Sequence, residues 1–370
     1  MKRYTRQLIV SIFILLFAVL LYQLNQIERT ELMDNEGRSF VKAQVTEIVR
    51  DNLTESGSRV GQQIVKLRIR SGIHKGEVLE ASSTASYLYG ADCTVGLKVI
   101  AILSESGNHI SASVYNYDRG NILYGIVFFF LIVLWLLGGR KGFRSALGLI
   151  FTFVCIVFLF LPLVYRGWSP IVCAALVVIL TTVVVMYLID GMTTKTVCAI
   201  LGTVGGVAVS AAFAWIFGKI SHISGWNVSD VENLDYIGMM TDVRVGELMF
   251  AGILISALGA VMDVAMSVAS TINEIHEKNP ALGRRELFLS GIHVGRDMMG
   301  TMSNTLILAF TGGSLNTLIY IYCYNYNYYQ VLNMYDIGIE IIQGIAATLG
   351  VILTVPFVAF ISAWLLVRHM

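Results

Sequence analysis

Long apolar runs with almost no charge constrain this chain more than any other feature of its sequence. Several extend for about 18 residues or more, the length that a helix needs to cross a hydrocarbon core roughly 30 Å thick. Of the 370 residues, 56% are hydrophobic and 14% are charged, against about 45–50% and about 25% in soluble domains. These features exclude an ordinary soluble enzyme and indicate a membrane protein that contacts the lipid bilayer.

The runs predict a polytopic α-helical membrane protein with about eight transmembrane helices. The first run, at about 8–24, follows three basic residues and lacks the small-x-small pattern of a cleavage site, so residues 1–26 are expected to form a cytoplasmic tail and an uncleaved anchor. The other spans are expected at residues 122–137, 146–165, 170–189, 197–217, 247–272, 297–320 and 338–367. They form a predicted seven-helix membrane domain over residues 120–370.

The composition changes between residues 27 and 119, where charges are frequent and short stretches alternate between apolar and polar residues. The alternation predicts strands around residues 41–45, 64–69, 78–79, 97–103 and 110–115, with glycines at the turns. About five short strands in about ninety residues favour a small all-β domain between the first two membrane helices, with an OB-like barrel as one candidate fold.

Basic residues predict the orientation of the chain, because short cytoplasmic loops are enriched in lysine and arginine. With the amino terminus inside, most of them fall on the cytoplasmic side: Lys2, Arg3, Arg6, Arg140, Lys141, Arg144, Lys195, Lys278, Arg284, Arg285, Arg296 and Arg368. Only Arg166, Lys219 and Arg244 fall in the short exterior loops. We therefore expect both termini in the cytoplasm and residues 27–119 outside.

Charge balance and missing motifs exclude several functional classes. The 26 Lys and Arg residues nearly cancel the 25 Asp and Glu residues, so nothing favours a nucleic-acid partner. The five cysteines lack the spacing of a zinc site or a disulfide framework and are interpreted as packing residues. No HExxH, GxSxG or phosphate-binding loop occurs. We expect no metal, cofactor or catalytic residues, and a non-enzyme is favoured over an enzyme.

Polar residues in the last three spans form the candidate site. In each span they recur at three- and four-residue steps and so share one helix face. The predicted buried polar site or transport path consists of Asp263, Ser267, Arg296, Asp297, Thr301, Asn304, Thr311, Glu340 and Gln343. We expect the three faces to converge on one interior site, and the pair Gly312 and Gly313 to loosen the seventh span.

Asp263 is the most informative of these residues, because an ionised carboxylate inside the bilayer costs several kcal/mol unless it is paired, hydrated or protonated. It lies about nine residues, roughly 13 Å, from the cytoplasmic end of its helix. Arg296 is a candidate partner for Asp263 or for an anionic substrate. A buried packing contact, a transport role and a catalytic role remain open.

The connection between the sixth and seventh spans predicts a short interfacial helix that ends before Gly291. The glycines at 291 and 295 then indicate flexible backbone over residues 291–297. A gate, a re-entrant segment and an ordinary loop on the membrane surface are all compatible with this pattern.

Two segments of the chain resemble a known family. They are residues 262–270, MDVAMSVAS, and residues 295–308, GRDMMGTMSNTLIL. Together they resemble the YibE/F-like family of multi-pass bacterial membrane proteins, over roughly the chain from Gly120 onward. The amino-terminal anchor and exterior domain resemble the longer, YibE-type members. The resemblance implies a location in the bacterial cell membrane and a shorter family relative as a heteromeric partner, and it brings no settled activity.

These features favour a transporter or permease-like component with a polar path through the last three helices. Neither a small molecule nor an ion can be named as its substrate. The alternatives are a structural or signalling subunit that binds a partner through the exterior domain, and an intramembrane enzyme that acts on envelope material.

Overall fold

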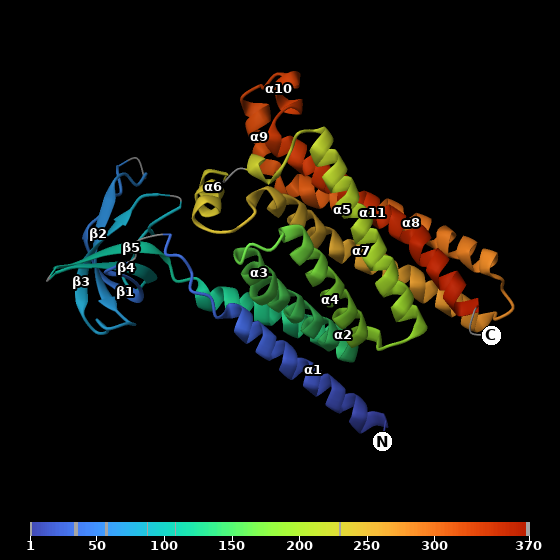
Figure 1. Cartoon of the computed structure of the whole chain (residues 1–370). Coiled ribbons are helices and arrows are strands. Elements are labelled where there is room, and N and C mark those ends of the chain that lie inside the picture. The colour runs from blue at the N-terminus through green and yellow to red at the C-terminus, as the bar shows by residue number, and fades with distance from the viewer. Residues whose placement is uncertain are drawn as a thin grey trace. The chain divides into compact units, whose positions relative to one another are not determined.

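The computed structural model describes residues 2–32, 36–55, 58–86, 88–107, 109–228 and 231–367 (Figure 1). The chain divides into two compact units. One comprises Met1–Thr30 with Trp135–Met370 and is helical, and the other comprises Glu31–Leu134 and holds the strands. Arg368 and the side chains of Lys2, Arg3 and Arg6, which entered the orientation prediction, lie outside the described residues.

The smaller unit contains a closed five-stranded barrel. Its strands are β1 (Arg38–Arg50), β2 (Gln62–Ile69), β3 (Val78–Thr84), β4 (Lys98–Ser106) and β5 (His109–Tyr117). They follow the order β1-β2-β3-β5-β4, and β1 pairs with β4 to close the barrel. Neighbouring strands are antiparallel except β3 and β5, which are parallel. Alternate residues fill the interior, as the sequence pattern predicted, and the small β-barrel is confirmed.

A buried glutamine fixes one side of the barrel interior. Gln63 on β2 is only 1% exposed. Its Oε1 accepts a hydrogen bond from the Cys93 backbone N–H at 2.9 Å, and its Nε2 donates to the Cys93 carbonyl at 3.0 Å. This pair of bonds satisfies the backbone of the segment before β4, which would otherwise be buried without partners.

A histidine links the β2–β3 turn to β4. His74 Nε2 lies 2.9 Å from a Glu105 carboxylate oxygen, and Nδ1 lies 3.1 Å from Glu77. Hydrogen bonds that the protonated ring donates to these two carboxylates, first Glu105 and then Glu77, raise the pKa of His74 above its usual range.

The larger unit is built from helices. The described helices are α1 (Lys2–Asn25), α2 (Gly120–Cys155), η1 (Ile156–Phe160), α3 (Leu161–Tyr165), α4 (Pro170–Asp190), α5 (Thr194–Ile220), η2 (Gly225–Asn227), α6 (Val231–Met240), α7 (Val245–Lys278), α8 (Arg284–Gly313), α9 (Leu315–Cys323), α10 (Tyr328–Leu332) and α11 (Tyr335–Leu366). The beginning of α2 belongs to the smaller unit.

Among the described residues, five helical runs are long and apolar enough to cross a membrane. They are Gly120–Tyr165, Pro170–Asp190, Thr194–Ile220, Val245–Lys278 and Tyr335–Leu366. The number rises to six if α8 and α9, which are bent by 61°, form one broken span. A polytopic membrane protein is therefore supported, whereas the predicted eight spans are not confirmed.

The first of these runs was predicted as two spans with a loop between residues 137 and 146. Helix α2 instead covers this segment with two helical stretches that meet in a kink at Gly139, where φ is 54° and ψ is −133°. This left-handed conformation suits glycine, because other residues would bring Cβ against the backbone. The predicted break between two helical stretches is therefore present, but it is a kink at one glycine and not a loop of several residues.

Helix α11 lies against α5, α7 and α8 (Figure 1). Two glycines let α5 and α11 approach closely. A Cβ atom added to Gly206 would overlap Thr354 Oγ1 and lie 2.8 Å from Val261 Cγ1 and 3.1 Å from the Gly350 carbonyl oxygen. Small residues at such crossings bring backbones close enough for dense packing inside a membrane.

Helix α8 runs without a break from Arg284 to Gly313. The predicted interfacial helix and flexible segment over residues 291–297 are therefore wrong. A Cβ at Gly291 would lie 2.9 Å from Ala359 Cβ, and one at Gly295 would lie 3.0 Å from Val355 Cγ2. These two glycines allow α8 to pack tightly on α11, and they do not loosen the backbone.

Candidate functional site

The last long membrane helix before α11 is broken at Ser314. Helix α8 ends at Gly313, α9 begins at Leu315, and the two are bent by 61°. The Ser314 backbone N–H and hydroxyl both donate to the Phe310 carbonyl, at 3.1 and 3.2 Å. The predicted loosening at Gly312 and Gly313 agrees with the position of this break.

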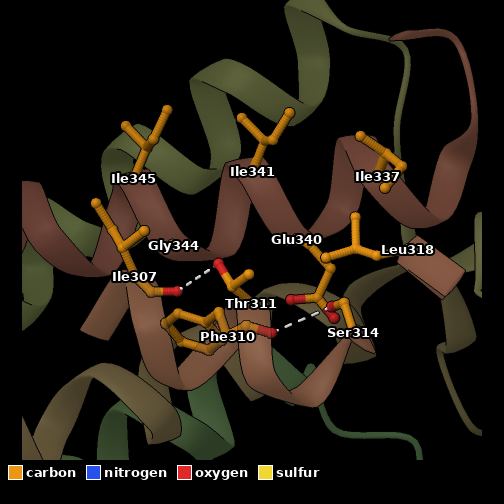
Figure 2. A pocket seen from close by; sticks show the side chains of 10 residues that line it. All are labelled: Ile307, Phe310, Thr311, Ser314, Leu318, Ile337, Glu340, Ile341, Gly344 and Ile345. Atoms are coloured by element: carbon orange, nitrogen blue, oxygen red, sulfur yellow. Dashed lines mark hydrogen bonds between the residues drawn. The ribbon is translucent and has the colours of Figure 1, made fainter. Parts of the chain in front are cut away.

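A cavity of about 390 Å³ lies beside the break, between α8, α9 and α11 (Figure 2). Its walls are mostly apolar, with three polar side chains: the lining is Ile307, Phe310, Thr311, Ser314, Leu318, Ile337, Glu340, Ile341, Gly344 and Ile345. Figure 2 shows the Glu340 carboxylate directed toward Ser314. The Thr311 hydroxyl donates to the Ile307 carbonyl at 2.8 Å, so its own hydrogen is already used.

A second cavity of about 270 Å³ adjoins the first and shares Ser314 and Glu340 with it. Thr317 and Asp336 also line it, so two carboxylate side chains lie close to the helix break. The carboxyl end of α8 and the amino end of α9 meet at this break, so their opposite partial charges largely offset each other. The two carboxylates are therefore the groups here that can attract a positively charged species or accept a proton.

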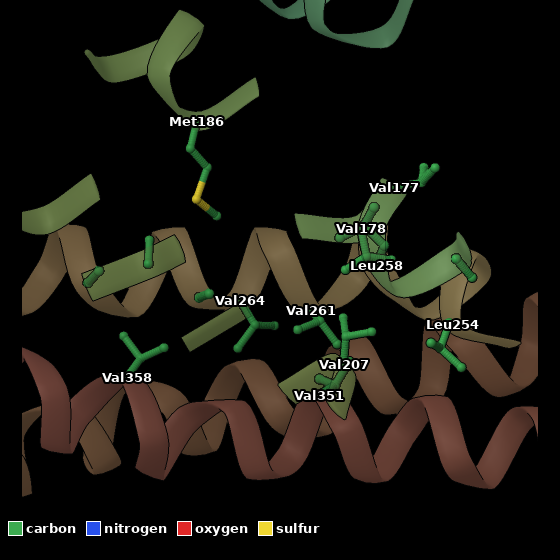
Figure 3. Close-up of a cluster of buried hydrophobic side chains, with 14 of the residues drawn as sticks. Val177, Val178, Met186, Val207, Leu254, Leu258, Val261, Val264, Val351 and Val358 are labelled. Carbon is green, nitrogen blue, oxygen red and sulfur yellow. The ribbon is translucent and has the colours of Figure 1, made fainter. Parts of the chain in front are cut away.

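Asp263 lies at the middle of α7 but does not face the interior. Its neighbours Val261 and Val264 are fully buried and point into the hydrophobic core (Figure 3). Asp263 itself is exposed on the surface of the chain. Val261 lies against the crossing of α5 and α11, which places Asp263 at the depth of that crossing. In the described part of the chain no ion pair joins Asp263 to Arg296.

The other predicted residues fall into two groups. Arg296, Asp297, Thr301 and Asn304 are exposed on α8, whereas Ser267 on α7 and Gln343 on α11 are half-buried. The structure brings Thr311 and Glu340 together in one cavity. It does not bring Asp263 and the exposed residues of α8 to a shared interior site within the single chain.

Three polar site residues were not predicted. Ser314, Thr317 and Asp336 line the cavities at the break, but none of them belongs to the predicted polar site. The signal that could have found Ser314 is its place directly after two glycines. Asp336 in the first turn of α11 resembles an ordinary helix-start residue, so the sequence carried no signal for it.

The cysteine interpretation holds in part. Cys93, Cys155, Cys173 and Cys198 are buried and free, whereas Cys323 is exposed, so the packing role predicted for Cys323 is wrong. Across the residues that the structure describes, no group of three or more His, Cys, Asp or Glu side chains is arranged to hold a metal ion.

Comparison with known proteins identifies one match. Residues 126–368 match the family described as YibE/F-like protein. This match covers well over half of the chain and confirms the resemblance carried by residues 262–270 and 295–308. No curated protein and no solved structure is similar enough to the chain to match it.

Proposed function

The chain belongs to the YibE/F-like protein family, and on that premise we propose that it is a permease whose path passes the break between α8 and α9. One observation carries the proposal: the Glu340 side chain lines a cavity at a broken membrane helix. Many transporters bind ions and substrates at interrupted helices, because the break exposes backbone groups inside the membrane.

The proposed path admits a cation or a proton. Glu340 and Asp336 supply two carboxylates at the helix break. Isoleucines line one side of the cavity beside Glu340, and Ser314 and Thr311 add hydroxyl groups to it. Carboxylates in such surroundings bind cations or carry protons in pumps and transporters.

The rest of the predicted polar set remains part of this proposal. Thr311 belongs to the cavity itself, and Gln343 lies one turn beyond Glu340 on α11. Asp263, Ser267, Arg296, Asp297, Thr301 and Asn304 would extend the path along α7 and α8. Those exposed on the single chain would line it only where another subunit covers them.

We also propose the predicted topology, with both termini in the cytoplasm of a bacterial cell and residues 27–119 outside. Eight spans result if Gly139 divides the run Gly120–Tyr165, α8 and α9 form one broken span, and α1 is the anchor. The barrel would then be an exterior OB-like domain. Its closed order β1-β2-β3-β5-β4, with only β3 and β5 parallel, supports the OB-like assignment.

The flux of H⁺, Na⁺ and K⁺ into proteoliposomes that contain the full chain tests the proposal. We expect flux of at least one of these ions, and we expect Glu340→Gln to remove most of it. The matched control is Glu232→Gln on the exposed surface of α6, which should leave the flux unchanged. Absence of flux for all three ions, or equal flux in Glu340→Gln, would contradict the proposal.

An exposed aromatic cluster on the barrel favours a second candidate function, that of a subunit which binds a partner. Phe40 on β1 and Tyr115 on β5 meet edge to face at 5.2 Å, and Tyr89 lies 6.1 Å from Tyr115. Exposed aromatic side chains are common at protein interfaces. The partner proposed from the family is the shorter relative. Its co-purification with the full chain should be lost in the variant Phe40→Ser/Tyr115→Ser. It should be kept in the control variant Val60→Ser, because Val60 is also exposed on the smaller unit but lies outside the aromatic cluster.

A further inference from the structure

Helix α8 has one face packed on the bundle and an opposite face left open. Gly291 and Gly295 mark the packed face, where they contact Ala359 and Val355 of α11. At 100° per residue, the opposite direction carries His293, Asp297, Gly300 and Asn304. All four are exposed on the single chain.

Part of this open face lies at the middle depth of the membrane. Gly295 packs against Val355, and Gly344 lies against Phe310. Asn304 falls between Gly295 and Phe310, so it is level with the middle of α11, which extends from Tyr335 to Leu366. In the described part of the chain no hydrogen bond reaches the Asn304 side chain, and no ion pair reaches Arg296 or Asp297. Facing lipid, these groups would lack the partners that polar groups need there.

The spacing of the open face matches that of a paired helix. His293, Asp297, Gly300 and Asn304 follow each other at steps of four, three and four residues, the pattern of a left-handed helix pair. A Cβ atom added to Gly300 would meet no atom within 4 Å, so this position leaves room for a close neighbouring backbone. An asparagine at such a core position specifies a two-helix pair, because the two amides bond each other.

Charge identifies the neighbour as a second copy of this chain. Arg296 and Asp297 are adjacent in sequence and therefore nearly at the same depth, about 1.5 Å apart along the axis. Two copies related by a twofold axis along the membrane normal place Arg296 of each beside Asp297 of the other. The face is thus self-complementary, as an isologous interface requires. A neighbour other than a second copy would need its own basic and acidic side chains at this depth to pair with Asp297 and Arg296.

We propose that two copies of this chain associate through a parallel pair of α8 helices, with Asn304 facing Asn304 and with reciprocal Arg296–Asp297 ion pairs. This inference does not depend on the proposed transport activity. The same face continues to Ile307 and Thr311, which also line the cavity at the helix break. The second copy would therefore approach the cavity from its open side.

Cysteine cross-linking in native membranes tests the pair. In the described part of the chain Cys323 is the exposed cysteine, so Cys323→Ser provides the background. Paired cysteines must bring their Cα atoms within about 7 Å to form a disulfide. Under mild oxidation, Asn304→Cys should form a dimer of twice the chain mass, whereas Trp215→Cys on α5 and Phe360→Cys on α11, both exposed, should not. Absence of an Asn304→Cys dimer, or cross-linking to a smaller protein, would overturn the proposal.

A charge swap separates the pair from a simple folding effect. Arg296→Asp should reduce the Asn304→Cys dimer yield severalfold, because four carboxylates then meet at one depth. The double variant Arg296→Asp/Asp297→Arg restores opposite charges across the axis, and its dimer yield should return to that of the parent. Native mass of the uncross-linked variants in detergent should follow the same order. If the double variant stays monomeric while it folds and inserts like the parent, the assigned pairing is wrong.

Discussion

The crossing of α5 and α11 gives a quantitative prediction for Gly206→Ala. The added Cβ would overlap Thr354 Oγ1 and lie 2.8 Å from Val261 Cγ1 and 3.1 Å from the Gly350 carbonyl oxygen. Overpacking of this kind costs about 1–3 kcal/mol. Alanine also removes backbone entropy from the unfolded chain, a gain of about 0.5–1 kcal/mol that any helical glycine would show. The steric cost must therefore be measured against another glycine.

Gly259→Ala on α7 is the matched control, because a Cβ there meets no atom within 4 Å. The midpoint of thermal unfolding, followed by tryptophan fluorescence of the full chain in detergent, should be lower in Gly206→Ala than in Gly259→Ala. A loss of about 1–3 kcal/mol corresponds to about 2–12 °C for a domain of this size. Gly206→Ala/Thr354→Ala should recover part of the difference. Equal midpoints for the two single variants would refute the steric argument.

Three further predictions concern other parts of the chain. Gln63→Leu leaves the Cys93 backbone without its two buried hydrogen bonds, at a cost of about 1–3 kcal/mol. Thiol labelling of Cys93, read by mass spectrometry, should then be about 5- to 160-fold faster, and an unchanged rate would contradict the role of Gln63. For His74, the folded pKa is raised by Glu105 and Glu77, so its contribution to stability is complete below about pH 6.5 and is lost as the pH rises through the folded pKa. An NMR titration of the full chain, with the signal assigned by His74→Gln, should give a pKa above 6.5, and a lower value would contradict the ion-pair geometry. Cys323 is exposed at the last residue of the broken span, which the proposed topology places at the outer surface, so a membrane-impermeant thiol reagent should label it from outside intact cells. Labelling only after cell lysis would reverse the proposed topology.

The barrel could be predicted from the sequence because the alternation of apolar and polar residues along a strand also shows which side chains face the interior. Val41, Ala43 and Val45 point inward at every second position, and an all-β domain has only one apolar interior for them to fill. Four of the five predicted strands lie within the observed ones, and the strand predicted at residues 97–103 begins one residue before β4. The strand order could not be predicted, because it depends on pairings between strands far apart in the chain.

Glycine was the main source of error in the membrane part. The sequence cannot distinguish a glycine that allows close packing from one that interrupts a helix. Gly291 and Gly295 were interpreted as flexible, yet they pack against α11, whereas Gly139 breaks α2 inside a segment that was predicted to be a loop. Gly312 and Gly313 were interpreted correctly, since the break follows them directly. The two kinds of glycine differ in whether another helix packs against them, and the local sequence does not specify that neighbour.

The polar faces raise a more general point about membrane helices. Periodicity shows that Asp297 and Asn304 share a face, but it does not show whether that face points into the bundle or away from it. In a soluble protein the apolar face must be buried, so the direction follows. In a membrane both the packed face and the lipid face are apolar, and this argument fails. The direction came only from Gly291 and Gly295, which fix the packed side of α8. The polar face opposite them therefore points away from the bundle of the single chain, where a second membrane helix would supply the partners that its side chains need.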